Sequence, residues 1–512
     1  MLEMLLSGFI SVLQPENIIF IFGGVAVGCV LGAIPGLTAT MAICLIIPIT
    51  YTLTPTQSLI MLLAAYNAGT FGGSLSAILI GTPGTPAAAA TVKDGYQLAQ
   101  QGQAGKAIKV ALYASCFGCL FSSVILILIA EPIAAFALKF GPAEYAVLMV
   151  FSLTLIASAA GKSIIKGLLG GMFGLIAGCV GLDSMYTIPR LTFGSLKLSS
   201  GLDLVVVLIG MLAFSEIMKG VESVAAGHTS AHLPKEKEKN DSKVTKSDWK
   251  MILPHMFRSA PLGCAIGALP GLGPALACFL GYDLGEKYAK KPEKYGNGSI
   301  EGVACAETAN NAVCGANMVP LLSLGVPGDT GAAVLIGAFV VQGLTPGPLV
   351  FKESPETVYN VYAGLIVCNL VLAILVLLTW KFFKKICSVE TTIIYPAVLM
   401  FCVVGTYALN RSMTDVWTML IFSVVGYLLM KMEFPMATVL IGFILSPIFE
   451  KNFRRALTLS DMDFTCFFSS PLCWVFWAAT ALSLFVILLG RMKAKKGQKS
   501  RLTEACEVEG EN

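Results

Sequence analysis

The chain has 512 residues, of which 56% are hydrophobic and only 13% are charged, and its formal net charge is +4. A soluble globular protein carries about 25% charged residues, so this composition excludes a soluble chain. Long apolar runs must face lipid or other helices, and they predict an all-α polytopic membrane protein. Lys and Arg are confined to loops and the tail, and no basic patch indicates nucleic-acid binding.

Motifs for enzyme chemistry are absent from the sequence. It contains no Gly-x-Ser-x-Gly and no His-Glu-x-x-His, and its three His residues lie in or beside a Lys-rich stretch. The fifteen Cys residues follow neither the spacing of a metal site nor that of a disulfide framework. We therefore expect no enzyme, no metal site and no cofactor, with most Cys as small core residues.

An internal duplication is visible in a repeated decapeptide. Gly-Cys-Val-Leu-Gly-Ala-Ile-Pro-Gly-Leu at 28–37 recurs as Gly-Cys-Ala-Ile-Gly-Ala-Leu-Pro-Gly-Leu at 263–272, with seven of ten residues identical. Downstream of each copy stands an Asn-Ala pair, at Asn67 and Asn311, and fourteen residues after each Asn comes Gly-x-Pro-Gly. Interrupted apolar segments at equivalent places in two halves are typical of the binding site of a secondary transporter.

The basic residues predict how the chain crosses the membrane. Lys-rich segments face the cytoplasm, and here they are a linker at 235–250, a stretch at 381–385 and the tail at 491–501. The N-terminus has no basic residue before Lys93 and is expected outside. One arrangement satisfies all of these constraints, and in it the two halves have opposite orientations. We therefore predict an inverted structural repeat with two re-entrant helical hairpins and about 11–12 membrane segments.

The predicted segments follow from the apolar runs. In the first half they lie near 18–52, 110–138, 142–160, 163–181 and 203–218, with a hairpin near 58–92. In the second half they lie near 253–283, 356–380, 392–408, 412–429 and 435–449, with a hairpin near 301–346. The loop at 284–299 falls outside in this arrangement although it carries four Lys residues, so its side stays open.

This arrangement divides the chain into five parts. They are transmembrane repeat 1 at 1–220, a basic cytoplasmic linker at 221–250, an inverted transmembrane repeat 2 at 251–450, an extra terminal span within 451–490 and a basic cytoplasmic tail at 491–512.

Pro-Gly pairs inside apolar sequence predict helix breaks at Pro35-Gly36 and Pro270-Gly271. A break frees backbone groups that lipid cannot satisfy, so protein, water, ligand or ion must complete their hydrogen bonds. The alternative is a packing kink in which the decapeptide glycines are small contacts between helices. The break occurs in both copies, which favours a functional role.

The hairpin tips are the stronger candidates for substrate binding. Each tip would end one short helix and begin another, whose N-terminus offers free amides to a carboxylate. The preceding helix end offers carbonyls to a cation such as Na⁺, whereas ordinary surface turns are the alternative. The candidate substrate-binding residues are Asn67, Thr82, Pro83, Gly84 and Thr85 in the first half and Asn311, Gly325, Val326, Pro327 and Gly328 in the second.

Polar residues near the second tip are candidates for cation binding. Glu307 and Asp329 are ionisable and costly in lipid, so each is a functional candidate. Asn310 stands about one helical turn after Glu307, and Thr330 directly follows Asp329. Two alternatives remain open. Amides inside apolar helices can bond across helices, and the carboxyl groups can lie in a solvated mouth.

These residues together resemble the large membrane subunit, TctA, of the tripartite tricarboxylate transporters. The resemblance covers the chain from about Asn17 to Arg491. It is carried by the residues at 32–37, 71–79, 83–86, 94–96 and 102–105, and most specifically by those at 307–312, 320 and 324–328.

The resemblance implies a multi-pass permease of the bacterial inner membrane. Such a permease works with a small four-helix membrane subunit (TctB-like) and a periplasmic solute-binding protein (TctC-like) that delivers a carboxylate. We expect symport of a tricarboxylate or dicarboxylate driven by a gradient of Na⁺ or H⁺, with one bundle moving against the rest. The alternative function is an uncoupled channel or facilitator for small organic anions.

Overall fold

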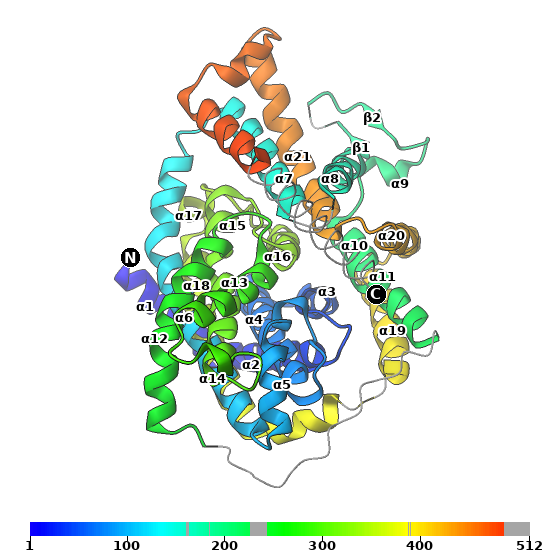
Figure 1. Cartoon of the computed structure of the whole chain (residues 1–512). Helices are drawn as coiled ribbons and strands as arrows, with labels where there is room; N and C mark the ends of the chain where they lie inside the picture. Colours follow the sequence, from blue (N-terminus) through cyan, green and yellow to red (C-terminus); the bar gives the residue numbers. More distant parts are fainter. Residues whose placement is uncertain (160–162, 184, 226–242, 388, 390, 486–512) are drawn as a thin grey trace, which may run out of the picture.

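The fold comes from a computed structural model that describes residues 1–159, 163–183, 185–225, 243–387, 389 and 391–485 (Figure 1). The centre of the predicted linker at 221–250 and the whole predicted tail at 491–512 lie outside the described residues. Within the described part, eight helices are long and apolar enough to cross a membrane, and further apolar helices are shorter. The chain is therefore a helical polytopic membrane protein, as the composition predicts.

The first half consists of helices and one short β-hairpin. Its elements are α1 (Leu2–Val12), α2 (Pro15–Ala33), α3 (Ala39–Thr50), α4 (Pro55–Ile80), η1 (Pro86–Ala88), α5 (Thr91–Gln100), α6 (Ala104–Ala137), α7 (Pro142–Ala159), α8 (Ile164–Gly178), β1 (Gly181–Leu182), β2 (Pro189–Arg190), α9 (Leu196–Ser199), α10 (Leu204–Leu208), the π-helical turn η2 (Ile209–Phe214) and α11 (Ser215–Ala225). Strand β1 pairs with β2 in antiparallel register.

The described part of the second half is helical. Its elements are α12 (Lys246–Gly267), α13 (Gly273–Lys287), η3 (Pro292–Lys294), α14 (Ile300–Ala316), α15 (Met318–Leu324), α16 (Thr330–Val341), α17 (Val350–Glu353), α18 (Pro355–Cys387), α19 (Thr391–Asn410), α20 (Met413–Lys431), α21 (Met436–Leu459), η4 (Phe464–Phe468) and an apolar helix at Pro471–Phe485.

Two segments that the sequence predicts as single long spans, 18–52 and 253–283, are each two helices. The first is α2 followed by α3, and the second is α12 followed by α13. Gly36 and Gly271 follow the prolines with φ of 87° and 86°, a left-handed conformation that glycine adopts without steric cost. An apolar run of some 30 residues is long enough to span a membrane, so the length of the run misled the prediction.

The direction of α13 corrects the predicted topology. The middle of α12 lies beside the start of α14, where His255 Nε2 lies 3.8 Å from Glu301 Oε1. The later Gly263 and Gly267 pack on Ala309 and Val313, so the two helices run parallel. α13 starts near the other end of α14, where a Cβ on Gly273 would lie 3.6 Å from Asp329, and it returns until Gly285 packs on an early turn of α14. The chain thus reverses at Pro270-Gly271, and 253–283 does not carry it from one side to the other.

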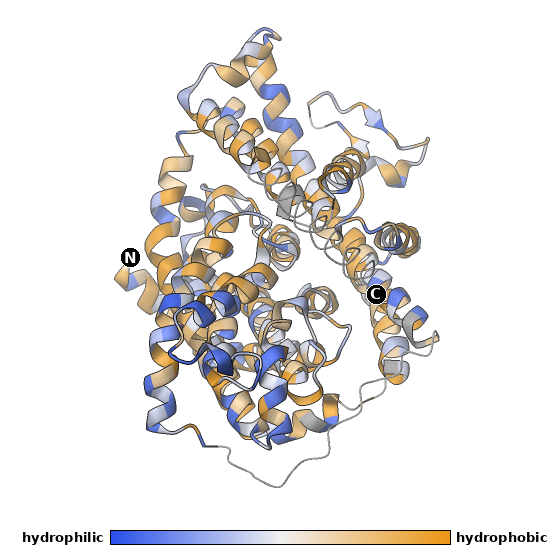
Figure 2. Cartoon of the chain, viewed as in Figure 1, coloured by the Kyte–Doolittle hydropathy of each residue, from blue (hydrophilic) through white to orange (hydrophobic). Residues whose placement is uncertain are grey.

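The loop at 284–299 therefore lies at the end of the molecule where α12 begins. Asp94 Oδ1 accepts hydrogen bonds from the backbone N–H of Gly298 and Ser299 at 2.9 and 2.8 Å. Lys106 and Asp248, in the first turns of α6 and α12, form an ion pair of 2.9 Å at the same end. Figure 2 shows hydrophilic residues gathered here, on the loop after α13 and on the start of α12.

Equivalent helices of the two halves pack in the same way. α2 lies against α4 and α12 against α14, because a Cβ on Gly28 would lie 2.5 Å from the Ala65 oxygen and one on Gly263 would lie 2.3 Å from the Ala309 oxygen. Ala65 and Ala309 each stand two residues before the repeated Asn. The decapeptides are thus surfaces of close helix packing. Figure 1 places α7, α8, α10, α11 and α19–α21 in a second bundle beside this one.

Candidate functional site between the two tips

The first tip, which we define as residues 81–86, folds back along α4. The helix ends at Gly81, whose φ is 71°. Thr82 and Pro83 follow in the loop, and the Gly84 N–H donates to the Gly73 oxygen at 3.2 Å. A Cβ on Gly84 would lie 2.1 Å from the Gly32 oxygen. Only glycine therefore allows this approach to the end of α2.

The second tip, residues 325–330, has the same construction. α15 ends at Gly325 with φ of 72°, and the Val326 N–H donates to the Pro320 oxygen at 3.2 Å. After Pro327, the Gly328 oxygen accepts from the Gly271 N–H at 2.6 Å, which ties this tip to the break after α12. A Cβ on Gly328 would lie 2.1 Å from Asn317 Oδ1, so glycine is required here as well.

Asp329 caps α16 with its own side chain. Its Oδ1 accepts from the Ala332 N–H at 2.7 Å, and its Oδ2 accepts from the Tyr66 hydroxyl at 2.8 Å. The Tyr66 oxygen also accepts from Asn317 Nδ2 at 2.8 Å. The helix end predicted to hold a substrate carboxylate thus carries a carboxyl group of the protein.

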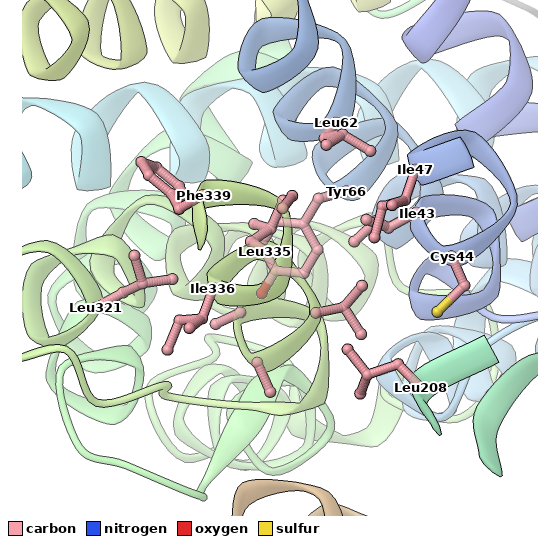
Figure 3. Packing of buried hydrophobic residues seen from close by; sticks show 14 of the residues in the cluster. Ile43, Cys44, Ile47, Leu62, Tyr66, Leu208, Leu321, Leu335, Ile336 and Phe339 are labelled. Carbon is pink, nitrogen blue, oxygen red and sulfur yellow. The ribbon is translucent and has the colours of Figure 1, made fainter. Parts of the chain in front are cut away.

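Tyr66 connects the first half to the second tip from an apolar position. Its ring lies among side chains of α3 and α16 that include Ile43, Ile47, Leu335 and Ile336 (Figure 3). Only 2% of the Tyr66 surface is exposed. This near-complete burial strengthens the hydrogen bond to Asp329, because the local dielectric constant is low.

A cavity of about 270 Å³ lies where the two tips and the two helix breaks meet. It is lined by Thr38, Ala39, Thr40, Tyr66, Thr70, Thr85, Pro86, Ala87, Leu212, Glu216, Gly271, Gly273, Pro274, Ala275, Asp329, Thr330, Met436 and Ala437. The Thr38 hydroxyl donates to Glu216 Oε2 at 3.4 Å. These lining residues include two carboxyl groups and five Thr hydroxyls. None of them is Lys, Arg or His.

The repeated asparagines lie away from this cavity. Asn67 Nδ2 donates to Asn369 Oδ1 on α18 at 3.0 Å. Asn311 Nδ2 donates to Ser115 Oγ on α6 at 2.8 Å. Each Asn thus bonds to the long helix of the other half, which favours the alternative of bonding across helices. Substrate contact by Asn67 or Asn311 stays a prediction with no support from this geometry.

Glu307 and Asn310 lie together in the protein interior. Glu307 is fully buried, and its carboxyl group accepts from the Thr91 hydroxyl and from the Ser115 hydroxyl, the latter at 3.1 Å. Asn310 is also fully buried, and neither its Nδ2 nor its Oδ1 has a hydrogen-bond partner within the protein. In the described residues no basic side chain forms an ion pair with Glu307.

The comparison with known families decides the class of protein. Residues 18–441 match the family described as Tripartite tricarboxylate transporter TctA family. The chain belongs to this family. A TctA chain is a component of a tricarboxylate transporter and is not an enzyme.

Two relatives come from Agrobacterium vitis. One, described as "Uncharacterized 52.8 kDa protein in TAR-I ttuC' 3'region", is 35% identical over 489 residues that cover 96% of each chain. The other, "Uncharacterized protein in TAR-II ttuC' 3'region", is 34% identical over 236 residues, which cover 46% of this chain and 98% of the relative. No solved structure matches this TctA chain.

Sequence reasoning missed several residues that line the cavity of this TctA chain. Thr38 and Thr40 follow the first helix break, and Glu216 follows the π-helical turn η2. An acidic residue at the end of the apolar run 204–214 was the available signal for Glu216. The Thr residues gave none, because Thr occurs throughout apolar helices.

Proposed function

We propose that this chain is the permease subunit of a binding-protein-dependent secondary transporter that imports carboxylates together with a cation. The cavity between the tips carries the proposal. Residues of both tips and of the segments after both helix breaks line it, and interrupted helices from two halves form the binding site in many secondary transporters. Family membership supports the carboxylate class.

The size and lining of the cavity fit a small organic anion. Its volume of about 270 Å³ is just below the range of ~300–1,000 Å³ that is typical of ligand pockets. The hydroxyl groups of Thr38 and Thr40 can donate to carboxylate oxygens. The first tip carries no acidic cap that would repel the anion.

The charges around the cavity favour coupled transport over a channel. A carboxylate in this cavity meets Asp329 and Glu216 with no basic side chain in the described lining. Like charges at this depth repel strongly because the local dielectric constant is low. A cation or proton that enters with the substrate offsets the repulsion. An uncoupled facilitator would leave it uncompensated.

We place the Lys-rich end of the molecule in the cytoplasm and treat the halves as an inverted repeat. Tyr66 of α4 meets Asn317, and Thr70, further along α4, meets the earlier Cys314. The equivalent helices α4 and α14 therefore lie antiparallel. With the loop at 284–299 at the end where α12 begins, its Lys residues agree with the positive-inside rule.

Partners and motion follow from the family and the two bundles. A TctC-like binding protein delivers the carboxylate at the outer face, and a TctB-like subunit packs beside this chain in the bacterial inner membrane. The tips belong to one bundle, whereas Glu216 and Met436 reach the cavity from the other. Movement of one bundle against the other opens the cavity to each side in turn.

Uptake by reconstituted vesicles tests this function. The chain is reconstituted with its TctB-like subunit, the TctC-like protein is added outside, and labelled citrate, tartrate and succinate are each offered. We expect at least one acid to accumulate above its outside concentration when a Na⁺ or H⁺ gradient is imposed. Equilibration without accumulation would favour the facilitator, and uptake of none of the acids would contradict the proposed substrate class.

A further inference from the structure

We propose that a Na⁺ ion binds beside Glu307, between the first tip and α14, at a site separate from the substrate cavity. We call this the Glu307 site and define it by Ser74, Thr85, Thr91, Glu307 and Asn310. It rests on the proposed function in one respect, which is that the ion bound there takes part in coupling, in addition to the cation or proton that offsets Asp329 and Glu216 in the cavity. Its existence as an ion site stands on the geometry of the side chains.

The Glu307 carboxyl group is oriented as an acceptor. Asn311 Nδ2 can only donate, and it donates to Ser115 Oγ at 2.8 Å. The Ser115 proton is therefore directed to Glu307 Oε2 at 3.1 Å. The Thr91 hydroxyl contacts the other carboxyl oxygen. A buried carboxylate of this kind requires a compensating positive charge, and the described residues around it supply none.

Polar atoms without partners surround this carboxyl group. The Ser74 hydroxyl lies beside the Glu307 carboxyl group and can donate to it, whereas the amide of Asn310 has no hydrogen-bond partner within the protein. The Thr85 hydroxyl has none either, although only 4% of Thr85 is exposed. Nearly all buried polar groups in proteins are paired, so a cluster of unpaired ones indicates a bound ion or water.

Helix geometry brings these atoms together. Asn310 stands three residues after Glu307 and four before Cys314, so the three share one face of α14. Cys314 lies opposite Thr70 of α4 at 3.7 Å and Glu307 lies opposite Ser74. Asn310 is therefore directed at α4 between these two contacts. The first tip closes the group, because a Cβ on Gly73 would lie 2.3 Å from Thr85 Oγ1.

The second half provides a check on this placement. Asn310 and Tyr66 occupy equivalent positions, one residue before the repeated Asn. Thr85 and Asp329 are also equivalent, because each directly follows the Gly-x-Pro-Gly motif. Tyr66 contacts Asp329 in the structure. The repeat thus pairs Asn310 with Thr85, with two unpaired side chains where the other tip has a completed hydrogen bond.

The donor set selects Na⁺ among the candidate charges. It offers one carboxylate with hydroxyl and amide oxygens, the hard oxygen ligands that suit a cation without redox chemistry. A single negative charge matches a monovalent ion. A proton on Glu307 would neutralise the carboxylate and could be donated to Ser74, but it would leave the side-chain oxygens of Asn310 and Thr85 unpaired. Close packing at Gly73 and Gly84 favours Na⁺ over the larger K⁺.

Thr85 gives the Glu307 site its connection to substrate. It is the member of the site that also lines the cavity between the tips. An ion that binds the Thr85 hydroxyl fixes the first tip in place, and this tip lines the substrate cavity through Thr85 and Pro86. The affinities of ion and substrate are therefore linked, as coupled transport requires.

Thermal unfolding of the purified full-length chain, without substrate, tests the site. A ligand that binds only the folded state raises the Tm with its concentration. We expect NaCl to raise the Tm of the wild type in a saturable manner relative to KCl at the same ionic strength. Glu307→Gln should abolish the Tm difference between NaCl and KCl. Ser74→Ala and Thr85→Val should raise by about tenfold the NaCl concentration that gives half of the full rise in Tm.

Glu301→Gln is the matched control, because Glu301 lies on the same helix in the first turn of α14, and it should keep the Na⁺ effect. If Glu307→Gln fails to fold, the Ser74 and Thr85 variants decide alone. Equal Tm values of the wild type in NaCl and KCl, or an unchanged Na⁺ effect in these variants, would overturn the site. Vesicle uptake driven by H⁺ alone would then leave the proposed function standing.

Discussion

Two sets of carboxyl groups with different partners lie in different regions of the described structure. At the end of α21, Asp183, Arg190, Glu450 and Arg454 form what we call the paired cluster. Arg190 Nη2 lies 3.0 Å from Glu450 Oε2, Arg454 Nη1 lies 3.1 Å from Glu450 Oε1, and Arg454 also bonds to Asp183. Each carboxyl group there has an arginine, and the cluster ties the β1–β2 hairpin to α21.

Unpaired carboxyls at the cavity and in the interior of the first bundle include Glu216, Glu307 and Asp329, none of which forms an ion pair within the described residues. Their hydrogen-bond partners are hydroxyl and backbone groups of Thr38, Thr91, Ser115, Tyr66 and Ala332. A buried charge without a partner costs several kcal/mol. Paired carboxyls thus serve the stability of the fold, whereas we expect unpaired ones to serve transport.

The largest effect should come from Asp329→Asn. Asn keeps an oxygen for the Ala332 N–H and a partner for Tyr66, so the tip should fold, but the charge beside the substrate is lost. We expect carboxylate uptake to fall by about 100-fold or more, with a normal amount of protein in the membrane. Asp203→Asn is the control, because Asp203 caps α10 in the same way. Normal uptake by Asp329→Asn would break the division into these two sets.

Gly328→Ala should have the next largest effect. The added Cβ would lie 2.1 Å from Asn317 Oδ1 and would push apart the contact between Asn317 and Tyr66 that supports Asp329. We expect uptake to fall by at least about tenfold, as positioning errors near 1 Å do in binding sites. Gly23→Ala is the matched control, because its Cβ would meet only Met61 Cε at 3.8 Å. Equal uptake by Gly328→Ala and Gly23→Ala would show that transport does not depend on the contact between Asn317 and Tyr66.

A smaller effect, on stability alone, is expected for Glu450→Gln. This change removes the charge that Arg190 and Arg454 share, and Glu450 is only partly buried, with 17% of its side chain exposed. The loss should be about 1 kcal/mol, seen as a fall of a few degrees in Tm. Uptake per folded molecule should match the wild type. A loss of uptake with unchanged Tm would indicate that the paired cluster takes part in transport and not only in stability.

The smallest effect concerns pH. Hydrogen bonds from Arg454 and from the backbone of Tyr186 and Met185 hold the pKa of Asp183 well below its usual range. A depressed carboxyl pKa adds stability above the unfolded value of about 3.9, and this stability is lost as pH falls through the folded value. The Tm difference between the wild type and Asp183→Asn should be constant from pH 5 to 7 and should narrow below about pH 4. A difference that changes between pH 5 and 7 would contradict this assignment.

The repeated motifs and the tips could be predicted from the sequence because Gly and Pro mark both, and these residues are selected by the backbone conformation. Glycine is required at Gly84 and Gly328 by contacts closer than any Cβ allows. Pro-Gly likewise marks the ends of α2 and α12. These signals lie in short stretches of the chain, so they can be recognised from the sequence alone.

The direction of α13 and the members of the cavity could not be predicted from the sequence. A Pro-Gly break in a long apolar run is compatible with a kink or with a full reversal, and only the packing of α13 on α14 decides between them. Tyr66 and Asp329 are 263 positions apart. Their contact depends on how the two halves dock, which no local pattern contains. Asn67 and Asn311 looked alike in sequence because they do the same structural work in each half.

The bond between Asn67 and Asn369 bears on how the chain is made. The two residues are 302 positions apart, and Asn67 is almost fully buried. At ~5–20 residues per second, ribosomes deliver the partner roughly 15–60 s after α4 has emerged. During that interval an amide in an apolar helix must be sheltered by the insertion machinery, by a chaperone or by water. The interlocking of the halves therefore makes biogenesis a stage at which a polar substitution in α4 or α18 can fail.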